Sequence, residues 1–257
     1  MPRTNDDAVR VPQPTVLFWV IKLLSTGAGE AISDFFVKTF DPVPVVLIAG
    51  VVFAACFAIQ ITARRYVPWR YWLFVSLVAV FGTMVADATH IVVGVPYPIS
   101  TGAFAIALAV VLIAWRLAEG TVSIHSITTG RRELFYWVTV LVTFALGTAL
   151  GDLTATSFGL GWLGSGVLFV ALFAMPGIAF LLRAPATLAF WWAYVLTRPL
   201  GASFADWLGM PPDAAGLGFG PLPVGAVGAA LIVAGVALLQ RRGRAMPVPA
   251  APYRGEG

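Results

Sequence analysis

The chain has 257 residues, of which 59% are hydrophobic and 11% are charged, and its formal net charge is +4. A soluble globular domain has about a quarter of its residues charged, so this composition excludes an ordinary soluble globule and favours a protein embedded in a bilayer. The single cysteine, Cys56, excludes an intrachain disulfide and disfavours a cysteine-based metal site, and we interpret it as a core-filling residue.

Eight membrane-spanning helices are predicted, because about 20 apolar residues cross a hydrocarbon core of about 30 Å. Uncharged runs of suitable length lie at residues 42–63, 71–86, 91–115, 134–151, 153–182 and 214–240. Two further runs, at about 15–36 and 186–206, carry charged residues within the apolar stretch. No cleavable signal is expected, since residues 1–14 are polar and the first apolar run contains Lys22, Glu30 and Asp34. The predicted fold is therefore an all-α polytopic membrane protein.

An aromatic–Trp pair recurs four times, with a glycine ten residues after the Trp and an aspartate fifteen residues after it. The pairs are Phe18-Trp19, Tyr71-Trp72, Tyr136-Trp137 and Phe190-Trp191; the glycines are Gly29, Gly82, Gly147 and Gly201; the aspartates are Asp34, Asp87, Asp152 and Asp206. These spacings predict four tandem repeats of two helices each, at about 15–64, 69–116, 134–182 and 186–240. The repeats form one membrane domain, residues 15–240, between an N-terminal segment 1–14 and a disordered tail 241–257.

This pattern resembles a bacterial family of membrane-anchored proteins made of four tandem repeats of unknown function, each with two transmembrane helices and a Trp. The resemblance covers about residues 11–240. It also rests on Phe18-Trp19-Val20-Ile21-Lys22, Ser123-Ile124-His125-Ser126-Ile127 and Leu196-Thr197-Arg198-Pro199-Leu200-Gly201-Ala202. It implies a fold and carries no biochemical activity, so the function has to be sought in the residues.

Thirteen of the sixteen Lys and Arg residues fall on one side of the predicted topology, in the N-terminal segment, the 62–70 and 116–133 loops, Arg183 and the tail. The other side has Lys38 alone, and Lys22 and Arg198 lie inside spans. Because cytoplasmic loops carry the excess of positive charge, we predict an inner (plasma) membrane protein with both termini cytoplasmic. An even number of spans per repeat makes the four repeats parallel. The basic charge then needs no nucleic-acid partner, and the lipid bilayer is the expected partner.

The candidate functional residues are the ionisable side chains inside the spans. They comprise five anions, Glu30 and the four repeat aspartates, against two cations, Lys22 and Arg198. Pairing would leave three negative charges, which an apolar interior tolerates by protonation, hydration or binding of a cation. We expect Arg198 to pair with an acidic residue of the first repeat, above all Glu30, because a guanidinium does not shed its proton.

Each repeated residue type also has a structural interpretation. The tryptophans are interface anchors or packing residues, or they line a site. The glycines permit close approach of helices or mark a local helix break. The aspartates cap helices at the outer loops or form a shared ionisable site at one depth. Pro199, directly after Arg198, is expected to kink or break its helix before Gly201.

No phosphate-binding loop, zinc spacing, nucleophile elbow or dinucleotide fingerprint is present, and His90 and His125 are predicted on opposite sides of the membrane. We therefore expect no enzyme and no cofactor. The expected function is transport of a small cation, a metal ion or a proton-coupled one, since carboxylate oxygens suit hard cations and protons. Alternatives are anion transport through Lys22 and Arg198, and a non-transporting sensor, scaffold or assembly factor. The substrate, its energy coupling and the oligomeric state are left open.

Overall fold

The computed structural model describes residues 9–181, 183 and 185–245, with the side chains of 179–181 and 243–245 left aside, and these residues form helices and connecting loops without strands. The predictions for residues 1–8 and 246–257 lie outside this part. The long helices are α1 (Val16–Thr39), α2 (Pro42–Ile61), α3 (Pro68–Asp87), α4 (Tyr97–Glu119), α5 (Gly130–Asp152), α6 (Gly161–Leu181), α7 (Ala186–Gly209) and α8 (Pro221–Ala245). The all-helical prediction is confirmed.

Prolines and polar caps set several helix ends. The Thr15 side chain accepts a hydrogen bond from the amide of Phe18 at the start of α1. The predicted apolar run 91–115 becomes helix α4 only from Tyr97, because Pro96 and Pro98 fit the first turn of a helix and not its interior. The preceding residues Ala88–Val92 (η2) instead continue α3 as a π-helical turn. Helix α8 runs through the predicted boundary at residue 240 to Ala245.

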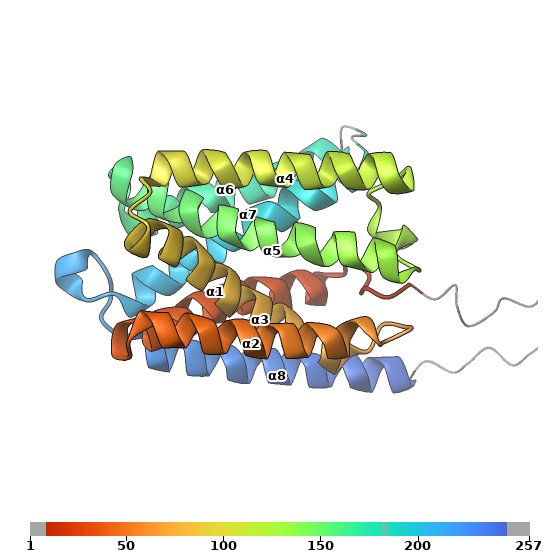
Figure 1. Cartoon of the computed structure of the whole chain (residues 1–257), viewed down its shortest axis with the longest axis horizontal. Coiled ribbons are helices and arrows are strands. Elements are labelled where there is room, and N and C mark those ends of the chain that lie inside the picture. Colours follow the sequence, from red (N-terminus) through yellow and green to blue (C-terminus); the bar gives the residue numbers. More distant parts are fainter. Residues whose placement is uncertain (1–8, 182, 184, 246–257) are drawn as a thin grey trace, which may run out of the picture.

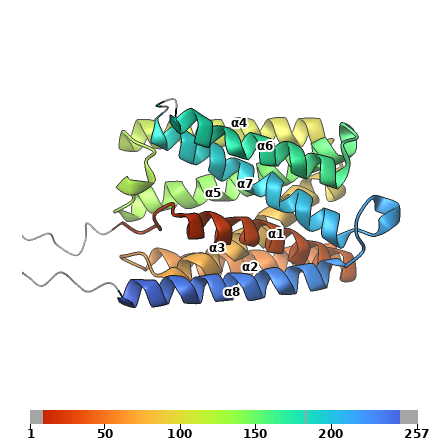
Figure 2. The ribbon, with the colours of Figure 1, turned by 180° about the vertical axis from the view of Figure 1, so that it is seen from behind.

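The helices that contain the repeated aromatic–Trp pairs, α1, α3, α5 and α7, form an inner bundle. In this bundle α1 packs on α3, α3 on α5, α5 on α7 and α7 on α1. The other four helices surround it. Each packs mainly against the inner helix of the next repeat, and the last packs against that of the first: α2 on α3, α4 on α5, α6 on α7 and α8 on α1. All eight run along the long axis of the molecule, and both ends of the described chain lie at the same end of it (Figure 1, Figure 2).

Polar and apolar side chains are distributed inside out. The outer helix α2 exposes large aliphatic side chains such as Leu47, Ile48 and Val51, which are 64% to 70% exposed. Lys22, Glu30, Arg198 and Asp206, in contrast, are buried in the inner bundle. Among the residues that the structure describes, seven helices are long and apolar enough to cross a membrane, and α7 is the long helix that does not qualify. Arg198, Asp206 and the internal Pro199 lower the hydropathy of α7, which contains the predicted span 186–206.

The N-terminal segment ties the inter-helix loops together at the end of the bundle where α1 begins. The amide of Arg10 donates to the carbonyl of Ile127 at 2.9 Å. Its guanidinium forms an ion pair of 3.0 Å with Glu133, whose side chain is fully buried. Glu133 also accepts hydrogen bonds from Gln60 at 3.2 Å and from the Trp137 indole at 3.3 Å. This end of the inner bundle is therefore covered by ordered chain.

Candidate functional site

One stripe of residues, spaced four apart, faces the axis of the inner bundle on each of its four helices. Residues i and i+4 lie on one face of a helix. The stripes are Phe18, Lys22, Thr26, Glu30 and Asp34 on α1; Tyr71, Val75, Ala79, Thr83 and Asp87 on α3; Tyr136, Val140, Phe144, Thr148 and Asp152 on α5; and Phe190, Tyr194, Arg198, Ala202 and Asp206 on α7. All are buried apart from Asp34, Asp87 and Asp152, which are partly buried. The repeated aspartates therefore stand at one end of these stripes and the repeated aromatic residues at the other.

A closed ring of aromatic side chains lies at the end of the bundle where the inner helices begin, which we call the aromatic end. The residue before each Trp contacts the Trp of the next inner helix. The ring-centroid distances are 5.5 Å for Phe18–Trp72, 5.4 Å for Tyr71–Trp137, 6.2 Å for Tyr136–Trp191 and 5.7 Å for Phe190–Trp19. Of the two interpretations of the tryptophans, the geometry places them in packing between inner helices, with Trp72 only 1% exposed.

The four repeated glycines let the inner helices approach closely, and each lies within a continuous helix. A methyl group added at one glycine would meet the next inner helix in turn: Gly29 meets Ala79, Gly82 meets Phe144, Gly147 meets Arg198 and Gly201 meets Thr26. At Gly82 the added carbon would lie 2.7 Å from Cβ of Phe144. The helix break considered for Gly201 is not seen, since α7 continues through Pro199 to Gly209. Pro199 therefore does not break α7.

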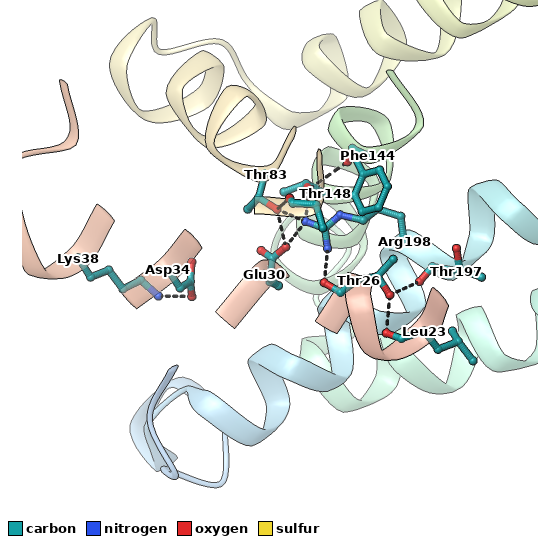
Figure 3. Close-up of polar contacts among 11 residues, drawn as sticks. Leu23, Thr26, Glu30, Asp34, Lys38, Thr83, Phe144, Thr148, Thr197 and Arg198 are labelled. Atoms are coloured by element: carbon teal, nitrogen blue, oxygen red, sulfur yellow. Dashed lines mark hydrogen bonds and ion pairs between the residues drawn. The ribbon is translucent and has the colours of Figure 1, made fainter. Parts of the chain in front are cut away.

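Arg198 joins all four inner helices at the middle of the axis (Figure 3). Its Nη2 forms an ion pair with Glu30 of α1, as predicted. The same nitrogen contacts the hydroxyl oxygens of Thr83 on α3 and, at 2.7 Å, of Thr148 on α5. Its Nη1 donates to the backbone carbonyl of Thr26 at 3.3 Å. The guanidinium is fully buried, so its charge is balanced by Glu30 and by hydroxyl oxygens rather than by water.

Lys22 lies between Arg198 and the aromatic ring and has no such partner. Its side chain is fully buried, and its ammonium nitrogen has no hydrogen bond to any described residue. The nitrogen instead lies 4.1 Å from the ring centroid of Phe144 and 4.4 Å from that of Tyr194. Aromatic faces attract a cation through their quadrupole, and more strongly when water is excluded.

The aspartates stand at the opposite end of the stripes, which we call the aspartate end. Asp34 is paired with Lys38 of its own helix at 2.7 Å (Figure 3). Asp87, Asp152 and Asp206 have no ion-pair partner among the described residues. Lys38, predicted as an isolated loop cation, thus neutralises one of the four carboxylates, because a spacing of four residues brings both side chains to one helix face.

The carboxylates form a loose group rather than a chelating one. Asp87 interacts electrostatically with Glu30, Asp152 and Asp34, and Asp206 interacts with Glu30, Asp34 and Asp152. No group of three or more His, Cys, Asp or Glu side chains within the described residues is close enough to hold a metal ion. Within the described residues, the aspartate end therefore gathers carboxyl groups around the axis without forming a metal cage.

Sequence reasoning missed the two threonines that hold Arg198. Thr83 and Thr148 occupy, in the second and third repeats, the position that Glu30 occupies in the first, eleven residues after the Trp. Aligning the repeats on their tryptophans would have revealed them. Also missed were the π-helical turns that directly follow Asp87 and Asp152, Ala88–Val92 and Leu153–Ser157. Such turns are rare in proteins, and those that occur often lie at functional sites.

A comparison with known families finds the same four segments. The model of a family described as Repeat of Unknown Function (DUF347) matches residues 17–66, 70–121, 135–184 and 189–245. Each matched segment runs over one inner helix and the helix that follows it. No curated protein and no solved structure matches the chain.

Proposed function

Because the chain belongs to the family of this repeat of unknown function, we propose its activity from its own residues: it is a multi-pass membrane protein that transports a cation along the axis of the inner bundle. The four repeats are then parallel two-helix units of one eight-helix membrane domain. The expectation that the chain is a member of a four-repeat family is confirmed, and the family brings no activity with it.

The inside-out distribution of side chains supports a bilayer location. Aliphatic residues cover the outer helices, while Lys22, Glu30 and Arg198 are buried among the inner ones. A bilayer solvates the former and forces the latter to find partners within the bundle. Arginines cluster in the chain segments at the aromatic end, so this end faces the cytoplasm and the aspartate end faces outward.

The observation that carries the transport proposal is the set of equivalent aspartates at one end of the axis. Three of them have no ion-pair partner among the described residues. A ring of carboxylates at the mouth of a pathway concentrates and selects cations. Transport of an anion is less well supported, because Arg198 is already bound to Glu30 and Lys22 is enclosed by aromatic rings. The absence of a chelating group within the described residues favours a proton or a monovalent cation over a resident metal ion.

The proposal is tested with purified protein in liposomes and a panel of protons, Na⁺, K⁺, Mg²⁺ and Mn²⁺. The double variant Asp87→Asn and Asp152→Asn removes two charges and keeps the shape of both side chains, and we expect it to lose the cation flux of the wild type. Asp213→Asn, at an exposed loop position beyond α7, is the matched control and is expected to keep that flux.

Both variants are first checked for insertion and for an unchanged thermal midpoint in detergent. Full flux in the double variant would remove the carboxylates from the pathway. No flux of any cation in the wild type would leave a non-transporting sensor, scaffold or assembly factor as the function.

A further inference from the structure

The aromatic end of the axis is closed to a hydrated ion. Phe18, Tyr71 and Tyr136, which lie on the axis at this end, are each 2% exposed or less. Their rings pack against the tryptophans of the neighbouring inner helices, and the N-terminal segment with the 121–129 loop covers this end. A cation with its water shell would have to displace several of these rings to pass.

Hydroxyl groups nevertheless cross this closed region. The hydroxyl oxygens of Tyr71 and Tyr136 are 2.5 Å apart, and those of Tyr136 and Tyr194 are 3.5 Å apart. All three side chains are buried, and they come from α3, α5 and α7. Tyr194 lies one helical turn deeper than the other two, directly beneath the ammonium of Lys22, which is 4.4 Å from its ring centroid. The three tyrosines thus come from the level of Lys22 and from the level of the aromatic ring, and Lys22 contacts the ring of Tyr194 without a hydrogen bond to a hydroxyl of the described residues.

Polar groups continue above Lys22 toward the aspartate end. The next levels of the stripes hold Arg198 with the Thr26 backbone, then Glu30 with the hydroxyls of Thr83 and Thr148. The outermost level holds the aspartates. Each level of the axis therefore carries at least one polar or ionisable side chain, although apolar residues such as Val75 and Val140 fill the remaining positions.

We propose that the cargo of this axis is the proton, and that the hydroxyls of Tyr194, Tyr136 and Tyr71 relay it across the aromatic ring. This inference rests on the proposed function and names its cargo. A water molecule on the Tyr194 side supplies a proton to that hydroxyl, each hydroxyl passes its own proton to the next, and a water molecule on the Tyr71 side accepts the last one, so every tyrosine keeps one hydroxyl proton after a passage. The ring can then remain packed, because the relay needs rotation of hydroxyl groups and not the entry of a hydrated ion.

The test uses full-length protein in liposomes that enclose a pH-sensitive dye, with the membrane potential set by a K⁺ gradient and valinomycin. Tyr136→Phe removes the central hydroxyl and keeps the ring, and Tyr71→Phe removes the terminal one. Both are expected to lower proton flux at least about tenfold, as loss of a positioned proton-transfer group commonly does. Tyr66→Phe removes a hydroxyl at the same end of the bundle that has no hydrogen-bond partner among the described residues, and it is expected to keep wild-type flux.

Thermal midpoints in detergent establish that the variants fold, and Na⁺ and K⁺ fluxes are measured in parallel. Loss of proton flux in both relay variants, together with slower wild-type flux in ²H₂O, supports the relay. Wild-type proton flux in Tyr136→Phe and Tyr71→Phe overturns it, as does a wild type that passes Na⁺ or K⁺ and no protons. In either of these cases the proposed cation transport survives if flux still depends on Asp87 and Asp152.

Discussion

Arg198 of α7 forms an ion pair with Glu30 of α1, and both side chains are withdrawn from solvent. The pair joins the last inner helix to the first and so closes the ring that α1, α3, α5 and α7 make. Thr83 and Thr148 bring the remaining two inner helices to the same guanidinium. The centre of the molecule is therefore a charged network that depends on all four repeats.

The first prediction concerns this pair. Glu30→Gln leaves a buried guanidinium without its counter-charge, and Arg198→Gln leaves a buried carboxylate, so each is expected to cost about 3–5 kcal/mol of stability. The double variant is expected to cost less than the sum of the two, because it leaves no unpaired charge. Thermal unfolding in detergent measures the cycle, and strictly additive losses would show that the two residues do not interact.

The second prediction concerns the glycines between inner helices. In Gly29→Ala the new methyl group meets Cβ and then the backbone of Ala79, and in Gly82→Ala it meets Cβ of Phe144 at 2.7 Å. We expect each to lower stability by about 1–3 kcal/mol, the usual cost of overpacking. Gly102→Ala in α4 is the control, since nothing lies within 4 Å of its added carbon. Equal thermal midpoints for all three variants would contradict the close approach.

The third prediction concerns Lys22. A fully buried ammonium without a hydrogen bond is expensive, and its attraction to the rings of Phe144 and Tyr194 offsets only part of the cost. Lys22→Met keeps an unbranched side chain that is one atom shorter and removes the charge, so we expect its thermal midpoint to equal or exceed that of the wild type. Lys22→Gln, which keeps a buried polar group, is expected to be less stable than Lys22→Met. A strongly lowered midpoint in Lys22→Met would mean that the charge stabilises the bundle.

The repeats made much of this architecture predictable. The fixed spacing from Trp to Gly to Asp identified the four repeats, and the presence of one buried arginine identified Glu30 as its partner. The arrangement of the four inner helices in a closed bundle was not predictable from hydropathy. No sequence signal states that the second helix of each repeat packs on the inner helix of the next repeat. Thr83 and Thr148 lie at the repeat position of Glu30, and this equivalence is the sequence signal for their contact with Arg198.

The ion pairing of the repeated aspartates was harder to predict than the Arg198–Glu30 pair. A count of charges inside the predicted spans left three unpaired anions, but it placed Lys38 outside the first span, in an outward-facing loop. In the structure Lys38 belongs to α1 and pairs with Asp34. Within the described part of the chain, the aspartates without an ion-pair partner are therefore those of the second, third and fourth repeats, and two of these directly precede π-helical turns.

The fourth prediction concerns orientation. In a Cys56→Ala background, a cysteine at Asp213 is expected to react with an impermeant thiol reagent added outside intact cells, and a cysteine at His125 is not. Both positions are exposed in the structure, so access to the side chain itself is matched. Labelling at His125 alone would reverse the orientation and would put the aspartate end in the cytoplasm.

The most direct measurement of the central claim is the reversal potential of the current through the reconstituted protein, with a cation gradient and an opposing chloride gradient across the bilayer. The account predicts a reversal potential that follows the cation gradient, protons foremost, and a current that disappears in the double variant Asp87→Asn and Asp152→Asn. A reversal potential that follows chloride, or an undiminished current in that variant, would contradict a cation pathway through the aspartates.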